Sequence, residues 1–301
     1  TEKCSGRERY DMRIVVYDAG KIGLWVNDQV INIDEHIPDG ANNTTQGRLA
    51  RLLEHLDGLR PTLQQAMHKG PFIPVSEVTL EAPVPKPSKI VCAFANYTEG
   101  GARSEVPLDM FLKSPASILG PGGTIVMPPF PARIFHHEAE LAFVIGKGGA
   151  HIAEADAMQH VAAYTCFMDI SARDTTRLGK SFDTFGPIGP ALVTADEVSD
   201  PHNLNVKLYV NDDLRQDYNT SDMANKIPAL IAFASSILTL EPGDVVATGT
   251  NHQGLSPIQD GDHLRLEIER VGTVEFDVRD AMKREWPRTI DEEMAKRVRQ
   301  M

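Results

Sequence analysis

The stretch HHEAELAFVIGK, residues 136–147, begins with polar side chains and continues as an apolar run. Successive side chains of a β-strand point to opposite faces, so Glu138 and Glu140 share one face while Ala139 and Leu141 share the other. Two carboxylates this close repel each other unless a positive charge lies between them. A hard divalent cation can supply that charge, since Mg²⁺, Mn²⁺ and Ca²⁺ prefer carboxylate oxygens. The alternative for such a pair alone is two exposed glutamates at a strand edge.

A third carboxylate follows in the segment YTCFMDISARD, residues 164–174, where Asp169 comes directly after apolar residues. At the end of a strand or helix it could complete a set of oxygen ligands that leaves coordination positions open for substrate and water. Two further segments bring Lys180, in KSFDTFGPIGP, and Thr250, at the end of PGDVVATGT. Their glycines let the backbone approach a ligand closely. None of these segments is diagnostic alone.

The composition narrows the class of protein. The chain has 301 residues and a formal net charge of -12 at pH 7, which argues against a nucleic-acid binder, since such proteins need a basic face. An acidic substrate is compatible with this charge, because one local cation can outweigh a distant negative surface. No apolar stretch approaches the roughly 18 uncharged residues that span a bilayer. We therefore expect neither a nucleic-acid partner nor a membrane partner.

The cysteines and the first residues indicate the cellular compartment of the protein. Cys4, Cys92 and Cys166 are few and widely spaced, so we expect neither a disulfide framework nor a zinc site. Reduced thiols are typical of the cytoplasm. The first residues, TEKCSGRERYD, are polar and lack the apolar region of a signal peptide. We expect a cytoplasmic protein in which residues 1–11 are an extension outside the fold.

We expect three regions along the chain. A small N-terminal α+β domain over residues 12–75 has short antiparallel strands followed by a helix over 44–68. A segment with five prolines between 71 and 87 is expected to link it to a second domain, because proline removes backbone donors. The second domain covers 84–280, and a charged tail with a helical pattern covers 281–301.

The second domain is predicted to consist mostly of β-strands. The strand candidates are Ile90–Phe94, Ala116–Leu119, Glu140–Ile145, Ala191–Thr194, Val206–Val210, Val245–Thr248, Leu264–Ile268 and Val274–Val278. Helices are expected over 154–164 and 221–238, the latter capped by Thr220 or Ser221. Many short strands with few crossovers indicate a β-rich α+β fold built on a sandwich, roll or barrel. The glycine motifs of nucleotide-binding proteins are absent from the sequence.

In combination and in this order, the segments of the second domain are specific. From about residue 89 to residue 278 the chain resembles the fumarylacetoacetate hydrolase family, and its small N-terminal domain resembles that of the bacterial members. The matching segments are KIVCAFANY, FLKSPASILGPGG, HHEAELAFVIGK, YTCFMDISARD, KSFDTFGPIGP, LTLEPGDVVATGT and DGDHLRLEIERVG. The resemblance implies a mixed β-roll or barrel catalytic domain, usually in a homodimer.

The resemblance also implies a metal site and a class of reaction. In the family a divalent metal is held by residues that match Glu138, Glu140 and Asp169, so we expect Mg²⁺, or else Mn²⁺ or Ca²⁺. Family members cleave or rearrange carbon–carbon bonds in 1,3-dicarbonyl acids, or decarboxylate or isomerise related oxo acids. Lys180 matches the family's lysine and could hold a substrate carboxylate or a developing oxyanion. The alternative for Lys180 is a solvated surface lysine.

Two more residues are candidates for substrate contacts. Thr250, with its backbone N–H, could bind a carboxylate or an enolate. Otherwise it is a strand-ending threonine with ordinary β propensity. Arg173 could contact the substrate, or it could pair with Asp174 or another neighbouring acid.

The chain departs from the family where the catalytic base is expected. Hydrolytic members usually carry a histidine four residues after the Asn of an N-Y motif and an acid three residues later, and together these activate water. Here Asn96-Tyr97 is followed by Gly100 and Arg103 at those positions. Both members of the dyad are missing, so hydrolysis by that dyad is in doubt.

Three replacements for the dyad are open. Glu99 or Glu105 could supply a carboxylate base. His252 could exchange a proton near neutral pH, or it is an exposed loop histidine. The third possibility is that no base is needed, as in metal-assisted decarboxylation. The Gly-rich segment 98–107, which carries both glutamates, is either a mobile lid that orders on substrate binding or an ordinary surface loop.

We therefore expect a divalent-metal-dependent hydrolase that cleaves a C–C bond in a small 1,3-diketo or acylpyruvate-type acid. One alternative is an oxo-acid decarboxylase or keto–enol isomerase on the same metal site. The other is a catalytically silent family member that acts as a binding protein.

Overall fold

The computed structural model describes residues 11–176 and 178–300, and two β-sheets form the framework of that part of the chain. The expected extension over residues 1–11 lies, except for its last residue, outside the described residues. The large sheet runs in the order β4 (Phe72–Pro74), β3 (Gln29–Asn32), β2 (Lys21–Val26), β1 (Arg13–Tyr17), β14 (Gly186–Thr194), β12 (Val161–Met168), β11 (Ala139–Ile145), β17 (Val245–Ala247), β6 (Ile90–Ala93) and β7 (Met110–Lys113). Off this path, β5 (Leu80–Glu81) pairs with β1 and β8 (Ile118–Leu119) pairs with β14.

The second sheet packs against the large one. Its order is β16 (Asp213–Asn219), β15 (Asn205–Val210), β18 (His263–Ile268), β19 (Gly272–Asp280) and β9 (Thr124–Met127), and β10 (Phe135–His136) pairs separately with β13 (Ser171–Ala172). Parallel pairs such as β17 with β6 and β19 with β9 occur among antiparallel ones. The β-rich, mixed architecture predicted from the sequence is confirmed, and solved structures described below share it.

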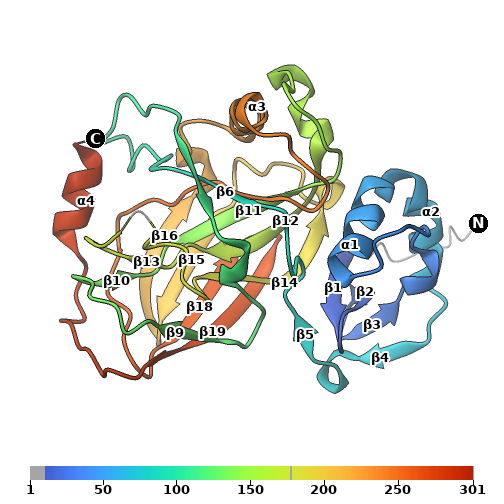
Figure 1. Ribbon diagram of the computed structural model, residues 1–301, viewed down its shortest axis with the longest axis horizontal. Helices are drawn as coiled ribbons and strands as arrows, with labels where there is room; N and C mark the ends of the chain where they lie inside the picture. The colour runs from blue at the N-terminus through green and yellow to red at the C-terminus, as the bar shows by residue number, and fades with distance from the viewer. Residues whose placement is uncertain (1–10, 177, 301) are drawn as a thin grey trace, which may run out of the picture.

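Helices lie around these sheets (Figure 1). The α-helices are α1 (Thr45–Glu54), α2 (Leu56–Ala66), α3 (Ile227–Ile237) and α4 (Glu292–Arg299). Short 3-10 turns are η1 (Asp34–His36), η2 (Val75–Glu77), η3 (Pro115–Ser117), η4 (Glu154–His160), η5 (Ala195–Glu197) and η6 (Thr220–Asp222). None of the helices in the described part of the chain has both the length and the apolar character needed to cross a bilayer.

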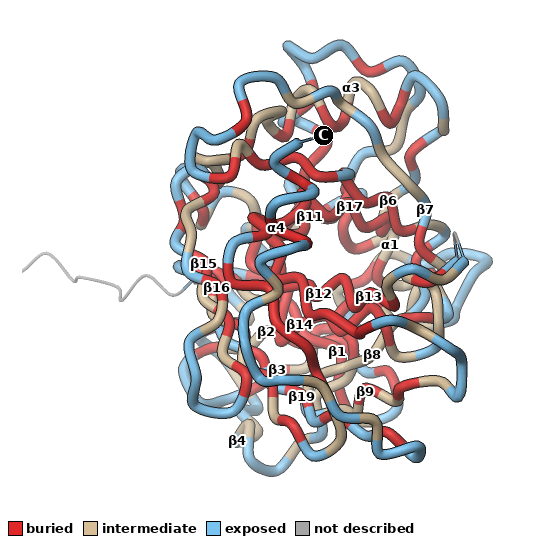
Figure 2. Tube along the Cα trace, turned by 90° about the vertical axis from the view of Figure 1, so that its left-hand side faces the viewer, coloured by how far each residue is buried: buried red, intermediate tan, exposed pale blue. Residues whose placement is uncertain are grey.

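The central strand β11 is buried on both faces. Leu141, Phe143 and Ile145 belong to the core between the two sheets, and Ala142 and Val144 belong to a second core that includes side chains of α1 and α2. Figure 2 shows β11, β12 and β14 as buried strands at the centre of the molecule. Charged side chains at the beginning of such a strand have no access to bulk water, so they need partners inside the protein.

The N-terminal strands continue the large sheet. Strand β1 pairs with β14, with Arg13 opposite Val193. The proline-rich segment is more ordered than the predicted linker, because β4 pairs with β3 and β5 pairs with β1. Proline is compatible with β4 because this strand lies at the edge of the sheet. The division into domains near residues 75 and 84 stays a prediction.

Several predicted helices are shorter than expected. The helix predicted over 44–68 is interrupted at His55, which separates α1 from α2. The helix predicted over 221–238 begins only at Ile227, because residues 220–222 form the 3-10 turn η6 and Pro228 favours the first turn of a helix. Its N-cap is Lys226, so the capping prediction for Thr220 or Ser221 was wrong. The helical part of the tail is limited to α4.

The prediction of a helix over 154–164 was wrong in its second half. Residues 154–160 form the 3-10 turn η4, and strand β12 begins at Val161. This strand pairs with both β11 and β14, and all of its residues are buried. Pairing on both sides satisfies the backbone of β12 within the sheet, which outweighs the local helical pattern.

Candidate metal centre and active site

Three buried carboxylates meet at the ends of two neighbouring strands. Glu138 directly precedes β11, Glu140 lies within it, and Asp169 directly follows β12. Because β11 and β12 are antiparallel, with Ala139 opposite Met168, the beginning of one strand lies beside the end of the other. One possible ligand oxygen from each acid lies within 4.8 Å of the others. The structure therefore brings together all three metal ligands predicted from the sequence.

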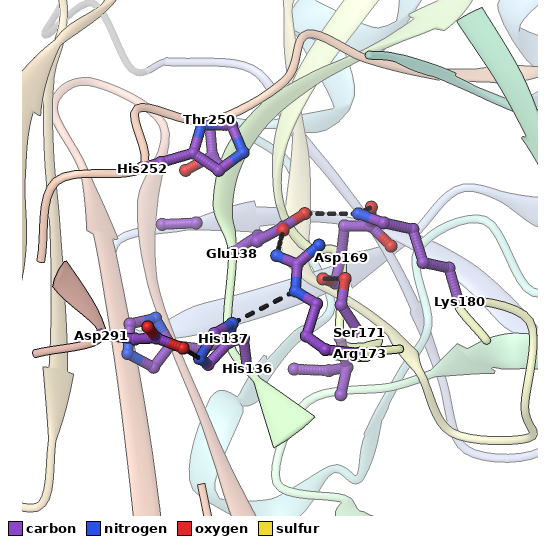
Figure 3. A network of polar contacts seen from close by, with 12 residues as sticks. His136, His137, Glu138, Asp169, Ser171, Arg173, Lys180, Thr250, His252 and Asp291 are labelled. Carbon is purple, nitrogen blue, oxygen red and sulfur yellow. Dashed lines mark hydrogen bonds and ion pairs between the residues drawn. The ribbon is translucent and has the colours of Figure 1, made fainter. Parts of the chain in front are cut away.

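Two of these acids are paired with cations (Figure 3). Nζ of Lys180 lies 2.6 Å from Oε2 of Glu138 and also contacts Asp169, and the guanidinium of Arg173 contacts Glu138. Nζ of Lys113 lies 2.6 Å from Oδ1 of Asp169. Lys180 is thus part of the site rather than a solvated surface lysine, and Arg173 pairs with a neighbouring acid.

Lys113 is a site residue that the sequence analysis missed. It lies at the end of β7, its side chain is fully buried, and it donates hydrogen bonds to Asp169 and to the carbonyl oxygen of Ile170. The only signal for it was its place in FLKSPASILGPGG, one of the segments that resemble the family. A lysine in that segment can be recognised as functional only once its distance to Asp169 is known.

The third acid, Glu140, has a different environment. The backbone N–H of Gly249 donates to Glu140 Oε2 at 2.8 Å. Burial and the nearby charges of Asp169 and Glu138 raise the pKa of Glu140 well above its usual range. For Glu138, burial also opposes ionisation, but Arg173 and Lys180 outweigh it and hold its pKa well below the usual range.

The donor set fits a hard divalent cation. All three candidate ligands are carboxylates, the oxygen donors that Mg²⁺, Mn²⁺ and Ca²⁺ prefer. The raised pKa of Glu140 marks a place where one more positive charge would relieve repulsion among the acids. Glu138, Glu140 and Asp169 could hold such an ion together.

Arg173 also donates a hydrogen bond to a buried histidine. Its Nε donates to Nδ1 of His136 at 3.1 Å, and Nε2 of His136 lies 3.2 Å from Oδ2 of Asp291 (Figure 3). Burial, together with the charge of Arg173, lowers the pKa of His136 to about 2, so its ring is neutral and can accept this hydrogen bond. Asp174, the other predicted partner of Arg173, contacts Arg133 and Arg297 instead.

Thr250 lies in the loop that follows β17, and its side chain is buried. Its hydroxyl oxygen accepts a hydrogen bond from Nε2 of Gln216 at 2.8 Å. Gln216 in turn accepts from the backbone N–H of Ala139 at 3.0 Å, so the position of the hydroxyl is tied to the strand that carries Glu140. Gln216 is a second residue that the sequence analysis missed.

The structure joins two of the candidate bases that the sequence left as alternatives. Nδ1 of His252 lies 2.8 Å from Oε1 of Glu99, and the backbone N–H of His252 donates to Oε2 of Glu99 at 2.9 Å. Both side chains are buried, so His252 is not an exposed loop histidine. Glu105, the other candidate on this segment, is exposed.

The residues at the usual dyad positions have other contacts. The guanidinium of Arg103 is buried and donates to the backbone carbonyls of Ala95 and Tyr97. The N–H of Gly100 donates to Oδ1 of Asp222 at 3.1 Å. Both residues hold the backbone of the Gly-rich segment in place, whereas its closure as a lid stays a prediction.

Comparisons with known proteins identify relatives of this chain. The profile of the family described as "Fumarylacetoacetate (FAA) hydrolase C-terminal" matches residues 89–279. A human protein named "Oxaloacetate tautomerase FAHD2B, mitochondrial" is 44% identical over 291 residues, which cover 88% of this chain and 90% of the relative. The human protein "Oxaloacetate tautomerase FAHD2A, mitochondrial" is 43% identical over the same shares of both chains.

Two solved structures are also similar to this chain. Maleylpyruvate hydrolase from Sphingobium sp. SYK-6, in complex with manganese (II) ion and pyruvate, is 39% identical with a TM-score of 0.82. The match covers 89% of this chain and 99% of that one. Fumarylacetoacetate hydrolase from Exiguobacterium antarcticum is 27% identical with a TM-score of 0.75, over 89% and 99% of the two chains.

Proposed function

Because the chain belongs to the fumarylacetoacetate hydrolase family, we propose that it is a divalent-metal-dependent enzyme that acts on a small oxo acid. The observation that carries this proposal is the set of three buried carboxylates with ligand oxygens within 4.8 Å of one another. The manganese-containing structure of a relative supports a divalent ion at such a site. Glu138, Glu140 and Asp169 are the proposed ligands, with Mg²⁺ as the first choice and Mn²⁺ or Ca²⁺ as alternatives.

The charges around the site support an acidic substrate. The three carboxylates are matched by Lys113, Lys180 and Arg173, so a divalent ion would leave the site with an excess of two positive charges. A small acid with one or two negative charges would reduce this excess, as does the carboxylate of Glu99 beside His252. When bound, the ion would polarise a substrate carbonyl and stabilise negative charge that develops on its oxygen. A 1,3-diketo acid of the acylpyruvate type suits such a site, because its neighbouring oxygens can bind one metal.

The side chains around the carboxylates have distinct proposed roles. Lys180 has a side chain that is 22% exposed, so its ammonium can meet a substrate carboxylate or oxyanion as well as the two acids. Arg173 fixes the carboxylate of Glu138, and Thr250 offers a hydroxyl whose position Gln216 holds. His252 is the proposed group that moves a proton.

We propose hydrolysis of a C–C bond as the reaction. The likeness to maleylpyruvate hydrolase, at 39% identity and a TM-score of 0.82, supports it, and so does the presence of a buried histidine where water could be activated. The test incubates the protein and Mg²⁺ or Mn²⁺ with acetylpyruvate and follows the products by NMR. Formation of acetate and pyruvate in equal amounts is expected. Intact acetylpyruvate in the presence of bound metal would contradict hydrolysis of this substrate class.

Keto–enol isomerisation of oxaloacetate is the second candidate, because two human relatives at 43% and 44% identity are named oxaloacetate tautomerases. The ultraviolet absorbance of the enol form distinguishes the candidates. An isomerase accelerates the decay of enol absorbance after fresh oxaloacetate is added, without forming new products. A decarboxylase would instead release CO₂ and pyruvate. Bound metal without turnover of either substrate would support a silent binding protein.

The proposed enzyme is a homodimer by its resemblance to the family, and sedimentation at micromolar concentration should give about twice the chain mass of 33.1 kDa. The two human relatives are named as mitochondrial proteins, so a cytoplasmic location for this chain stays a prediction.

A further inference from the structure

We propose that Glu99 is a positioning residue that holds His252 as the proton-transfer group of the site. This pair then takes the place of the histidine and acid that the chain lacks at Gly100 and Arg103. The inference rests on the proposed function, because it assigns roles within the same site.

The carboxylate of Glu99 holds His252 at two points. One oxygen lies 2.8 Å from the ring Nδ1, and the other accepts the backbone N–H of the same residue at 2.9 Å. The side chain of Glu99 is fully buried, and that of His252 is 8% exposed. A carboxylate next to Nδ1 selects the tautomer with hydrogen on Nδ1, so Nε2 is left as a proton acceptor. This is the arrangement by which a buried acid orients a histidine base.

The backbone around Glu99 is shaped for this contact. Glu99 has a φ of 57°, a left-handed conformation that is unfavourable for a residue with a long side chain. It is followed by Gly100 with a φ of 70°, where a histidine would be strained in the same way. Gln253, next to His252, donates to the carbonyl oxygen of Glu99 at 2.6 Å. The loop therefore directs Glu99 into the protein, one residue before Gly100, the position at which the family has its histidine.

The pair lies at the metal centre. His252 comes three residues after Gly249, whose backbone N–H donates to Glu140 Oε2 at 2.8 Å, and Figure 3 shows its ring beside Thr250. The charge of this ring affects the carboxyl group of Glu138. The groups that lower the pKa of Glu138 are, from largest effect to smallest, Arg173, Lys180 and His252. A base at this place is within electrostatic range of the acids that would hold the metal.

In both candidate reactions His252 takes up one proton and returns it to the product. In hydrolysis, Nε2 of His252 takes a proton from water as the water oxygen bonds to the substrate carbonyl carbon. The C–C bond then breaks, and its electron pair stays with the leaving carbon. The imidazolium returns its proton to that carbon, so the histidine is neutral again. In isomerisation the same nitrogen would take a proton from carbon and return it to oxygen. The carboxylate of Glu99 faces the ring through both steps and stabilises the imidazolium.

The test compares variants of the 301-residue chain on acetylpyruvate and on oxaloacetate. His252→Ala should lower kcat by roughly 10²-fold or more, the usual scale for a general base. Glu99→Gln should lower kcat by about 10- to 100-fold, the usual scale for an orienting partner, with KM near that of the unchanged protein. Glu99→Asp keeps the charge and should retain more activity than Glu99→Gln.

Two matched controls are available. Glu105→Gln makes the same chemical change on an exposed glutamate of the same segment. Asp277→Asn removes the acid beside Nδ1 of an exposed histidine, since Nδ1 of His263 lies 2.9 Å from Oδ1 of Asp277. Both variants should keep the kcat of the unchanged protein.

A spectroscopic measurement distinguishes positioning from mere structural support. NMR of the metal-free protein with ¹⁵N-labelled histidine should show His252 with hydrogen on Nδ1, and Glu99→Gln should shift it toward a mixture of tautomers. Added imidazole should partly restore His252→Ala but not the double variant with Glu99→Gln. If Glu99→Gln does not fold, the rescue of His252→Ala and the tautomer of the unchanged protein still decide the inference.

The outcomes separate the two proposals. An unchanged protein that binds Mn²⁺ but turns over neither substrate would contradict the proposed function. Turnover by the unchanged protein together with wild-type kcat and an unaltered His252 tautomer in Glu99→Gln would overturn the role of Glu99.

Discussion

Nζ of Lys180 lies 2.6 Å from Oε2 of Glu138 and contacts Asp169 as well, so one ammonium group links two of the three proposed metal ligands. The attraction of Asp169 and Glu138 outweighs burial and raises the pKa of Lys180 above its usual value. This cation therefore shares its two carboxylates with any metal ion that binds there.

Lys180→Met should separate metal binding from turnover. Because it removes a cation that competes for Glu138 and Asp169, Mn²⁺ affinity measured by isothermal titration should stay the same or rise. Turnover should fall by roughly 10²-fold or more, the scale of a lost oxyanion-stabilising group. Lys207→Met, at a lysine that is 41% exposed, is the control. If Mn²⁺ affinity and turnover fell by similar factors, the role of Lys180 would be to position the metal ligands only.

Glu140→Gln should abolish metal binding without harming the fold. The amide oxygen of the glutamine can still accept the hydrogen bond from Gly249. The change also removes a buried acid whose pKa is raised by burial and by the charges of Asp169 and Glu138. The metal-free variant should unfold at the same temperature as the unchanged protein or a higher one, while titration shows little Mn²⁺ binding. Glu138→Ala and Asp169→Ala should also weaken Mn²⁺ binding sharply. Unchanged affinity in all three variants would place the metal elsewhere.

Asp291 connects the C-terminal helix to the site, and two substitutions separate its roles. Its Oδ1 caps α4 by accepting from the N–H of Met294 at 3.0 Å, and its Oδ2 lies 3.2 Å from Nε2 of His136. Asp291→Ala should cost about 1 kcal/mol of stability through the lost cap, whereas Asp291→Asn should cost less because an asparagine oxygen also caps. Both should change Mn²⁺ binding by less than about tenfold, because Nε2 of His136 lies close to Oδ2 without a well-aligned hydrogen bond. Urea unfolding and titration measure the two effects. Equal stability of the two variants would rule out the capping role.

Asp280 should make stability depend on pH. Burial raises its pKa, but hydrogen bonds from the side chain and backbone of Arg284 and the backbone of Met282 outweigh burial and hold it below the usual value. A carboxyl with a lowered pKa in the folded state contributes stability that is present above the unfolded-state value, about 3.9, and is lost as the pH falls through the folded-state value.

Asp280→Asn should therefore cost about 2 kcal/mol at pH 7, and the difference from the unchanged protein should shrink at pH 3. Urea unfolding at both values measures it. Asp277→Asn, an exposed acid on the same strand β19, should have little effect at either pH. A penalty for Asp280→Asn that is equal or larger at pH 3 would contradict this assignment.

Much of the metal site follows from local rules in the sequence. Alternation along a strand is enough to place Glu138 and Glu140 on one face, and the apolar run after them indicates a buried strand. The strand predictions over 206–210, 264–268 and 274–278 succeeded for the same reason, since their alternating patterns match β15, β18 and β19. These features depend only on neighbours in the chain.

Other features depend on residues that are far apart in the chain. Val161–Met168 became a strand because β11 and β14 pair with it on either side, which no local pattern reports. Lys113 reaches Asp169 across 56 positions, and His252 meets Glu99 across 153. The sequence by itself determined most of the side chains that could do chemistry, namely the three acids, one of the two lysines and a histidine outside the family's usual position. Only the tertiary structure decided which of them act together, because a buried charge takes the partner that the packed strands and loops bring within hydrogen-bond distance.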